Sequence, residues 1–376
     1  MSRPIQGTVT LPGSKSESNR ALMIAAYGGF PLEIDGLSDA HDTVLLQTLL
    51  SNKEEIIDCQ DAGTVARFLL TYLSNKPGNR LLTGTSRLCE RPMAPLVDAL
   101  RHLGAVIDGY DLPLHIEGAT ISGGSVTLDA SQSSQFASSL LLAAPTWERG
   151  LQLSLSGAPV SMPYLEMTIK MMQHFGIQIE RNGNVITVAH QDYQVRPFTV
   201  SADWSAASYW YELLAVSDGG ELLLKGLTEP SLQGDAVVAE WFKAFGVDTF
   251  FESQGARLVK RGAASIPQGL VFDFTDHPDL FPAVYATSFA LGVEAEFKGT
   301  ETLAAKESDR YNALKTELAR IPKDFSLPMP VFSTYGDHRI AMSLAALKPL
   351  LGSIVVDDSV VVNKSYPGFW EEMESL

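Results

Sequence analysis

The sequence predicts a two-domain α/β protein built from repeated β-α-β-α-β-β units in which one helix of each unit is buried. Six times, a polar cluster rich in Ser, Gly, Asp, Lys or Arg leads into a stretch of small and apolar residues. Amphipathic stretches recur at intervals of roughly 70 residues and lead into β-rich segments. With 376 residues, 45% of them hydrophobic, the chain can form two separate cores.

The apolar stretches predict buried helices, because a helix that is apolar on most faces belongs in a core. The first has the clearest start, where Lys15, Ser16 and Arg20 precede small and apolar residues. A helix N-terminus presents unpaired amides and the positive end of the helix dipole, so it favours an anion. Several buried helix starts therefore indicate a negatively charged ligand. The stretches are 21–26, 65–73, 136–144, 206–216, 280–291 and 340–347.

Four amphipathic stretches predict outer helices, and three of them end at a Gly that stops the helix. A β-rich segment follows each of those three, and short alternating strands fill the gaps. A doubly wound dinucleotide-binding fold is the alternative, but the sequence contains no G-x-G-x-x-G turn. The outer helices are 96–103, 164–175, 238–245 and 312–321, and the strands include 105–107, 124–128, 177–179, 185–188 and 247–249.

The overall charge is strongly acidic, with 28 Lys and Arg against 44 Asp and Glu and a net charge of −16. This charge argues against nucleic acid or an anionic membrane surface as a partner. The two cysteines, Cys59 and Cys89, imply no disulfide framework, and the N-terminus has no apolar signal core. No apolar run approaches the ~20 residues of a membrane span. We expect a soluble, cytoplasmic monomer.

An anionic ligand needs cations concentrated locally, and the sequence has them beside Gly, Ser, Pro and Asp rather than along charged helix faces. A phosphate-binding P-loop is one explanation for the first cluster, but its glycine spacing and the Ser14 before Lys15 do not match that motif. A solvated Lys in a turn is the other alternative, which the neighbouring Ser16 and Arg20 disfavour. The cations are Lys15, Arg20, Arg67, Arg87, Arg91, Lys306, Arg310, Arg339 and Lys364.

Six motifs occur in the order typical of one enzyme family. They are LPGSKSESNRA at 11–21, DAGTVARF at 61–68, CERP at 89–92, SSQF at 133–136, KESDR at 306–310 and YGDHRIAM at 335–342. On these motifs the chain resembles the family of 5-enolpyruvylshikimate-3-phosphate synthases over nearly its whole length. The resemblance implies an enolpyruvyl transferase of aromatic amino acid biosynthesis that joins shikimate 3-phosphate to phosphoenolpyruvate and releases phosphate. It also implies a tetrahedral intermediate and no metal or organic cofactor.

The same resemblance implies the two-domain enolpyruvyl transferase architecture. Residues 1–14 and 203–376 are expected to form a discontinuous domain that carries the acid and base carboxylates. Residues 15–202 are expected to carry most ligands of shikimate 3-phosphate. The active site is then expected in the cleft between the domains, and in this family the inhibitor glyphosate occupies the phosphoenolpyruvate site.

The family pattern assigns ligands to both substrates. Lys15 corresponds to a Lys that touches both, and Gln135 to a residue between them. Gly63 matches a glycine that lets phosphoenolpyruvate lie close to the backbone, where any Cβ would intrude. The expected shikimate 3-phosphate ligands are Lys15, Ser16, Arg20, Ser133, Ser134, Gln135, Ser161, Asp279 and Lys306. The expected phosphoenolpyruvate ligands are Lys15, Gly63, Arg87, Gln135, Arg310, Arg339 and Lys364, whose guanidinium groups suit oxyanions.

The resemblance assigns the chemistry to Lys15 and two carboxylates. Asp279 is expected to accept the proton of the 5-hydroxyl, and Glu307 to deliver and remove protons at the methylene carbon. Paired carboxylates with different neighbours can play different roles, and Lys306 and Arg310 are expected to keep Glu307 ionised. A solvated helix start with local ion pairs is the alternative for this segment taken alone.

Four features depart from the family pattern. Asp61 replaces the usual Asn, and this charge either weakens anion binding or pairs with a nearby Arg. Phe68 stands where a Pro is common, and Thr302 where an Asn often helps to hold shikimate 3-phosphate. The segment after Arg320 is short, which predicts that one repeat is trimmed.

Two other functions are considered. The sister enolpyruvyl transferases that act on a UDP-amino sugar carry a reactive Cys five residues before an Arg-Pro pair, whereas Cys89 lies two before Arg91. A non-catalytic binding protein with the same fold is the other alternative. Retention of four residues argues against it: Lys15, Asp279, Glu307 and Arg339.

Overall fold

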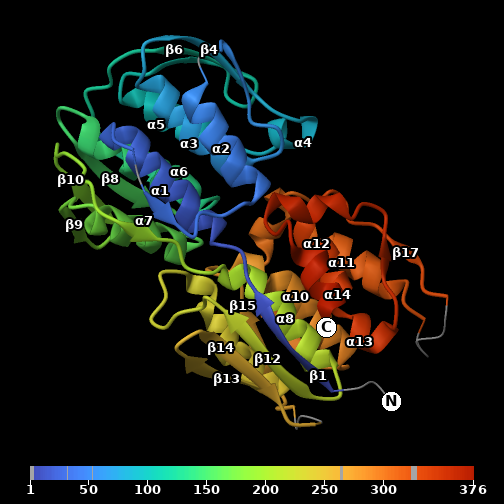
Figure 1. Cartoon of the computed structure of the whole chain (residues 1–376). Coiled ribbons are helices and arrows are strands. Elements are labelled where there is room, and N and C mark those ends of the chain that lie inside the picture. The colour runs from blue at the N-terminus through green and yellow to red at the C-terminus, as the bar shows by residue number, and fades with distance from the viewer. Residues whose placement is uncertain (1–3, 32, 53, 263–265, 323–327) are drawn as a thin grey trace. The chain divides into compact units, whose positions relative to one another are not determined.

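The computed structural model describes residues 4–31, 33–52, 54–262, 266–322 and 328–376. The chain divides into two compact units. Unit 1 contains Met1–Ser14, Ser38–His41 and Ser201–Leu376, and unit 2 contains Lys15–Leu37 and Asp42–Val200. The chain therefore leaves unit 1 after Ser14, contributes Ser38–His41 to it, and returns to it for good at Ser201 (Figure 1).

Three four-stranded sheets share one topology, in which the first two strands run parallel and the other pairs antiparallel. Unit 2 holds two of these sheets. The strand order of the first is β3 (Ile56–Asp58), β4 (Gly78–Thr83), β6 (Leu114–Gly118) and β5 (Val106–Asp108). The strand order of the second is β7 (Gly124–Asp129), β8 (Leu151–Ser156), β10 (Val185–Val188) and β9 (Ile179–Asn182). Unit 1 holds β1 (Ile5–Thr10), β12 (Gly220–Lys225), β14 (Gly255–Lys260) and β13 (Val247–Glu252). Each sheet belongs to a β-α-β-α-β-β unit, which confirms the predicted α/β fold.

The buried helices of unit 2 are α1 (Lys15–Gly28), α3 (Gly63–Ser74) and α6 (Ser134–Ala143), which all contact one another. They follow the polar clusters as predicted, and Ser133 caps α6 by accepting a hydrogen bond from the Gln135 amide. The outer helices are α2 (His41–Ser51), α5 (Ala94–His102) and α7 (Met162–His174), with the short α4 (Ser86–Cys89) and the 3₁₀ turn η1 (Ala144–Thr146). The two-stranded sheet β2 (Ile34–Asp35) and β11 (Phe198–Thr199) completes the unit.

Unit 1 is built around α8 (Trp204–Val216), in which every residue is buried. Asp203 caps this helix, which packs against α10 (Phe281–Ala290) and α12 (His338–Ala346). The stretch 238–245, predicted as one outer helix, is instead divided into α9 (Val238–Trp241) and the 3₁₀ turn η3 (Phe242–Phe245), and the 3₁₀ turn η2 (Gly234–Val237) precedes it. Gly246 closes it with a φ of 81°, a conformation that favours glycine.

The last repeats of unit 1 are shorter than the others. The strands β15 (Leu270–Asp273) and β16 (Ala295–Lys298) form a two-stranded parallel sheet, as do β17 (Val331–Phe332) and β18 (Val355–Val356). The remaining elements are η4 (Pro278–Leu280), η5 (Glu301–Ala305), α11 (Arg310–Ala319), α13 (Lys348–Leu351), η6 (Val360–Lys364) and α14 (Phe369–Ser375). Within the described ranges, no helix is both long and apolar enough to cross a membrane.

Candidate active site

The start of α1 presents a cation held by a neighbouring helix. Lys15 Nζ lies 3.0 Å from Oδ2 of Asp42, which belongs to α2 and is almost fully buried. The carboxylate of Asp61 lies within 4.8 Å of that of Asp42. The extra charge at position 61 therefore lies beside the acid that binds Lys15.

Arg20, one turn further along α1, is a buried cation with fixed geometry. Its Nε donates to Thr168 Oγ1 at 2.7 Å, and Nη1 donates to the Ser16 carbonyl at 2.9 Å. Its Nη2 donates to the Tyr164 carbonyl at 3.1 Å. Burial lowers the pKa of Arg20 to about 10, so the group stays charged at neutral pH.

Phe68 explains part of this geometry. The guanidinium carbon of Arg20 lies 5.7 Å from the centre of the Phe68 ring, within the range of a cation–π contact. The residue that departs from the family pattern thus supports a predicted substrate ligand. Sequence reasoning named Phe68 as a departure but did not foresee this contact.

The predicted serines lie at the starts of α6 and α7. Ser133 caps α6, and Ser134 is its first residue and is buried. Ser161 precedes α7 with a φ of 55°, a left-handed conformation that is uncommon for residues other than glycine. The structure therefore places all three hydroxyl groups at helix N-termini of unit 2.

The start of α3 carries a side-chain network that fixes Gln135. Arg67 Nη1 donates to Gln135 Oε1 at 2.9 Å, and Gln135 Nε2 donates to Thr64 Oγ1 at 2.9 Å. Arg67 also donates to the Pro92 carbonyl at 3.2 Å, and its guanidinium carbon lies 5.3 Å from the centre of the Phe136 ring. Both ends of the Gln135 amide are therefore held, which orients it at the helix start.

Gly63 is the first residue of α3 and lies against two guanidinium groups. A Cβ at this position would lie 2.6 Å from Arg67 Nη1 and 2.7 Å from Arg91 Nη1. Arg91 is buried, whereas the side chain of Arg87 is 43% exposed and pairs with Glu90 at 3.1 Å. The structure thus brings Arg91 to the buried helix start. The signal in the sequence was the position of Arg91 directly before Pro92.

Unit 1 gathers a second set of predicted residues around Asp279 in η4. Asp279 Oδ1 lies 2.7 Å from Arg310 Nη1, and Oδ2 lies 2.8 Å from Arg339 Nη2. Lys306 Nζ lies 3.9 Å from the same carboxylate. Burial opposes ionisation of Asp279, but Arg339, Lys306 and Arg310 together outweigh burial and hold its pKa well below the usual range.

Arg310 joins the two predicted catalytic carboxylates. Its Nη2 lies 2.6 Å from Glu307 Oε2, while its Nη1 binds Asp279. Its Nε donates to Asp337 Oδ2 at 2.9 Å. Arg310 is buried, but its three acidic partners outweigh this burial and raise its pKa above the usual value.

Asp337 belongs to this cluster, although the sequence analysis assigned it no role there. It is fully buried, accepts a hydrogen bond from Ser308 Oγ at 3.1 Å, and caps α12 through the Arg339 amide at 2.9 Å. An Asp before an apolar helical stretch is an N-cap signal, and this signal could have identified it. Lys364, the last predicted cation, is buried in η6, which packs against α12.

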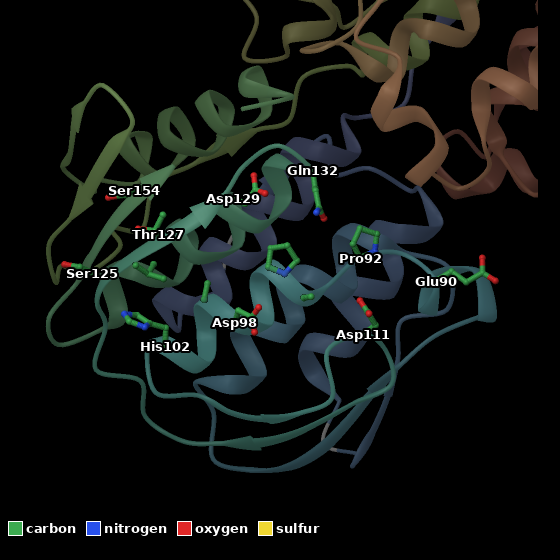
Figure 2. Close-up of a pocket in the computed structure, with 14 residues that line it drawn as sticks. Glu90, Pro92, Asp98, His102, Asp111, Ser125, Thr127, Asp129, Gln132 and Ser154 are labelled. Carbon is green, nitrogen blue, oxygen red and sulfur yellow. The ribbon is translucent and has the colours of Figure 1, made fainter. Parts of the chain in front are cut away.

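A cavity of about 820 Å³ lies elsewhere in unit 2, between α5 and β7 (Figure 2). Glu90, Asp98, Asp111 and Asp129 are among the residues that line it. Carboxylates repel anions, and none of the predicted ligands lines this cavity. It is therefore unsuited to the anionic substrates.

Buried helix starts, cations and paired carboxylates on repeated β-α-β-α-β-β units define an enzyme that acts on anionic substrates. The chain belongs to the family described as EPSP synthase (3-phosphoshikimate 1-carboxyvinyltransferase), which it matches over residues 1–52 and 44–373. This membership confirms the predicted resemblance.

Individual relatives agree with the family match. The chain is 41% identical over 391 residues to a 3-phosphoshikimate 1-carboxyvinyltransferase of Bacteroides fragilis, covering 98% of this chain and 95% of the relative. It is 33% identical to the enzyme of that name from Methanospirillum hungatei, covering 99% of this chain and 96% of the relative. An EPSP synthase structure from Acinetobacter baumannii has a TM-score of 0.76 at 22% identity, covering 100% of this chain and 96% of that one, and shows the same fold.

Proposed function

We propose that the protein transfers the enolpyruvyl group of phosphoenolpyruvate to the 5-hydroxyl of shikimate 3-phosphate and releases phosphate. The observation that carries this reaction is the pairing of Arg310 with both Asp279 and Glu307, beside Arg339. Groups that can bind an anion and groups that can move protons thus occupy one cluster. Membership of the EPSP synthase family supports the same reaction.

Three proton transfers follow from these roles. In the addition step, the 5-oxygen bonds to C2 of phosphoenolpyruvate and Asp279 accepts the hydroxyl proton, while Glu307, which takes up a proton from solvent when phosphoenolpyruvate binds, delivers that proton to the methylene carbon. In the elimination step, the bond from C2 to the phosphate oxygen breaks and Glu307 takes a proton back from the methyl group. The double bond reforms and phosphate leaves.

The ion pairs of the cluster link substrate binding to this chemistry. A carboxylate paired with two guanidinium groups has little affinity for a proton. An anionic substrate that binds Arg310 and Arg339 weakens their hold on Asp279 and Glu307, and both carboxylates then accept protons more readily. Binding of phosphoenolpyruvate therefore lets Glu307 take up the proton that it delivers and makes Asp279 a better base.

We propose that unit 2 supplies most shikimate 3-phosphate ligands, and that Asp279 and Lys306 of unit 1 supply the others. The contacts of Arg20 with Thr168, Ser16 and Tyr164, and a longer one to Ser138 Oγ at 3.4 Å, use four of the five guanidinium protons. The remaining proton is suited to a phosphate oxygen. The hydroxyl groups of Ser133, Ser134 and Ser161 are the further proposed ligands, with Ser16, Gln135 and Lys15.

For phosphoenolpyruvate, Arg91 is a stronger candidate than Arg87, because it is buried at the start of α3 beside Gly63. Arg310, Arg339 and Lys364 of unit 1 are the other proposed cations. Since the proposed ligands belong to both units, we propose that one pair of substrates contacts both. The cleft expected from the sequence remains part of this proposal.

Release of phosphate from phosphoenolpyruvate tests the function directly. Shikimate 3-phosphate is expected to support phosphate release, whereas a UDP-amino sugar is expected to give none. Release only with the sugar would assign the chain to the sister transferases. Tight binding of shikimate 3-phosphate without turnover would instead favour a non-catalytic binding protein.

A further inference from the structure

A carboxyl group lies in the core of unit 1, separate from the proposed catalytic groups. Glu212 of α8 is fully buried. Its Oε1 lies 3.2 Å from Ser343 Oγ of α12. Its Oε2 has no hydrogen-bond partner among the residues that the structure describes. A buried carboxylate with one neutral neighbour is costly, so its protonation state needs an explanation.

The hydrogen bonds of Ser343 indicate whether Ser343 or Glu212 donates the proton between them. Ser343 Oγ is also 3.0 Å from the carbonyl oxygen of Pro282 in α10. A hydroxyl donates one proton, and a carbonyl oxygen can only accept. If Ser343 donates to Pro282, its oxygen faces Glu212 as an acceptor. The proton between Ser343 and Glu212 must then come from the carboxyl group.

We infer that Glu212 stays protonated at neutral pH and donates its O–H to Ser343, tying α8 to α12 and thereby positioning Arg339. The same helices make a second contact, since Arg339 Nη1 donates to Tyr209 Oη at 3.4 Å. Tyr209 and Glu212 are three residues apart on α8, and Arg339 and Ser343 are four apart on α12. Both pairs therefore lie on facing sides of the two helices.

Glu212 is in this sense a positioning residue that acts through Arg339. Its effect on catalysis rests on the proposed function, whereas its protonation state does not. Glu212 lies one turn from Tyr209 along the helix, so the contact with Ser343 supports the helix pair behind the Asp279 cluster. A carboxylate in its place would lose the donor and leave a buried charge.

The surroundings of Glu212 agree with a neutral acid. Burial raises its pKa well above the usual range, and the contact with Ser343 offsets only part of this effect. Three charged groups on neighbouring elements have other partners. Lys260 of β14 binds the Ala215 and Ser217 carbonyls, Asp235 of η2 binds Ser205, and Arg339 of α12 binds Asp279, while Tyr211 on α8 itself binds Thr249 of β13.

Infrared difference spectroscopy tests the protonation state without any substrate. The spectrum of the wild type minus that of Glu212→Gln, recorded in D₂O at neutral pH, is expected to show the carbonyl stretch of a protonated carboxylic acid. Glu240→Gln, at an exposed position of α9, is the matched control and is expected to show a carboxylate band instead. A carboxylate band for Glu212 would overturn the inference.

Denaturant unfolding as a function of pH gives a second test. Because the folded state keeps the proton that the unfolded state releases, stability is expected to fall as pH rises from the unfolded toward the folded pKa. In that interval the unfolding equilibrium constant of the wild type is expected to rise up to tenfold per pH unit relative to Glu212→Gln. A difference that is independent of pH would contradict a protonated Glu212.

The positioning role has its own readout. The amide of Glu212→Gln keeps a donor for Ser343, so this variant is expected to retain the KM for phosphoenolpyruvate. Glu212→Leu removes the donor and is expected to raise that KM several-fold, with a smaller effect on shikimate 3-phosphate. Equal KM values in both variants would show that Glu212 does not position Arg339, and the protonation state would still be decided by the other two tests. If neither variant nor the wild type turns over, the infrared and unfolding results still decide the protonation state.

Discussion

Asp42 Oδ2 lies 3.0 Å from Lys15 Nζ, which fixes the amino group at the start of a buried helix. We expect Lys15→Met to reduce phosphate release by roughly 100- to 1,000-fold, because a preorganised charge that serves two anionic substrates is lost. Steady-state kinetics with a circular dichroism check of folding would measure this. Lys243→Met, at an exposed position of η3, is the control and is expected to behave as the wild type. Near-normal turnover of Lys15→Met would exclude the proposed role.

Substitutions of the two carboxylates are expected to affect proton exchange and substrate binding differently. Glu307→Gln is expected to slow deuterium exchange at the methylene carbon of phosphoenolpyruvate more than it weakens binding of shikimate 3-phosphate. Asp279→Asn is expected to impair both, because Asp279 is the proposed partner of the 5-hydroxyl. Mass spectrometry of the recovered substrate and calorimetric binding measure the two effects. Unchanged deuterium incorporation with Glu307→Gln would refute its assignment.

Arg91 and Arg87 provide a matched pair, since both lie in the same short segment. We expect Arg91→Met to raise the KM for phosphoenolpyruvate about 10- to 100-fold, the usual range for a lost charge-assisted hydrogen bond. Arg87 pairs with Glu90 at an exposed position, and such pairs contribute little, so we expect Arg87→Met to raise this KM less. The opposite order of KM values would favour the role that the sequence assigned to Arg87.

Cys89 separates the two branches of enolpyruvyl transferases. Its Sγ lies 3.6 Å from the Gly84 carbonyl, which is a weak hydrogen bond in a structural position. We expect Cys89→Ser to keep most of the activity, because no thiol chemistry is required. Complete loss of turnover by a folded variant would favour the sister branch.

Acid is expected to destabilise unit 1 through Asp279. Its pKa is held well below that of an unfolded Asp, so its contribution is complete above pH 3.8 and is lost as pH falls through the folded-state pKa. The stability gap between the wild type and Asp279→Asn is therefore expected to be largest near neutral pH and to narrow in strong acid. Urea midpoints at several pH values measure this gap. A gap that widens in acid would show that Asp279 is not stabilised by its cations.

The sequence was sufficient for the architecture because the signals were local. Polar caps such as Ser133 and Asp203 precede apolar stretches, and these patterns specify buried helices. The division of the predicted helix 238–245 into an α-helical and a 3₁₀ turn was missed, because packing against neighbouring elements decides between α and 3₁₀ geometry.

The candidate site was only partly predictable, since side-chain contacts join residues far apart in the sequence. The cations were recognised as a set, but burial alone distinguishes Arg91 from Arg87. The roles of Asp337 and Phe68 depend on contacts with Arg310 and Arg20, which no spacing in the sequence reveals. In the sequence, Glu212 is only a polar residue in an apolar helical stretch. Its role is identified by its contact with Ser343, which the structure shows.

Within each repeat, the hairpin and the proposed ligands lie in different segments, and this separation has a practical consequence. The antiparallel hairpins β5–β6, β9–β10 and β13–β14 contain none of the proposed ligands, which lie at helix starts and in the turns before them. The shortened repeats at β15–β16 and β17–β18 lack such a hairpin among the described residues but still carry Asp279 and Arg339 beside them. Hairpins are thus the parts of the chain that can be rebuilt. The turn between β9 and β10 is exposed, so Asn184 is a suitable place to attach a fluorophore, whereas Gly183 has a φ of 59° that disfavours a side chain.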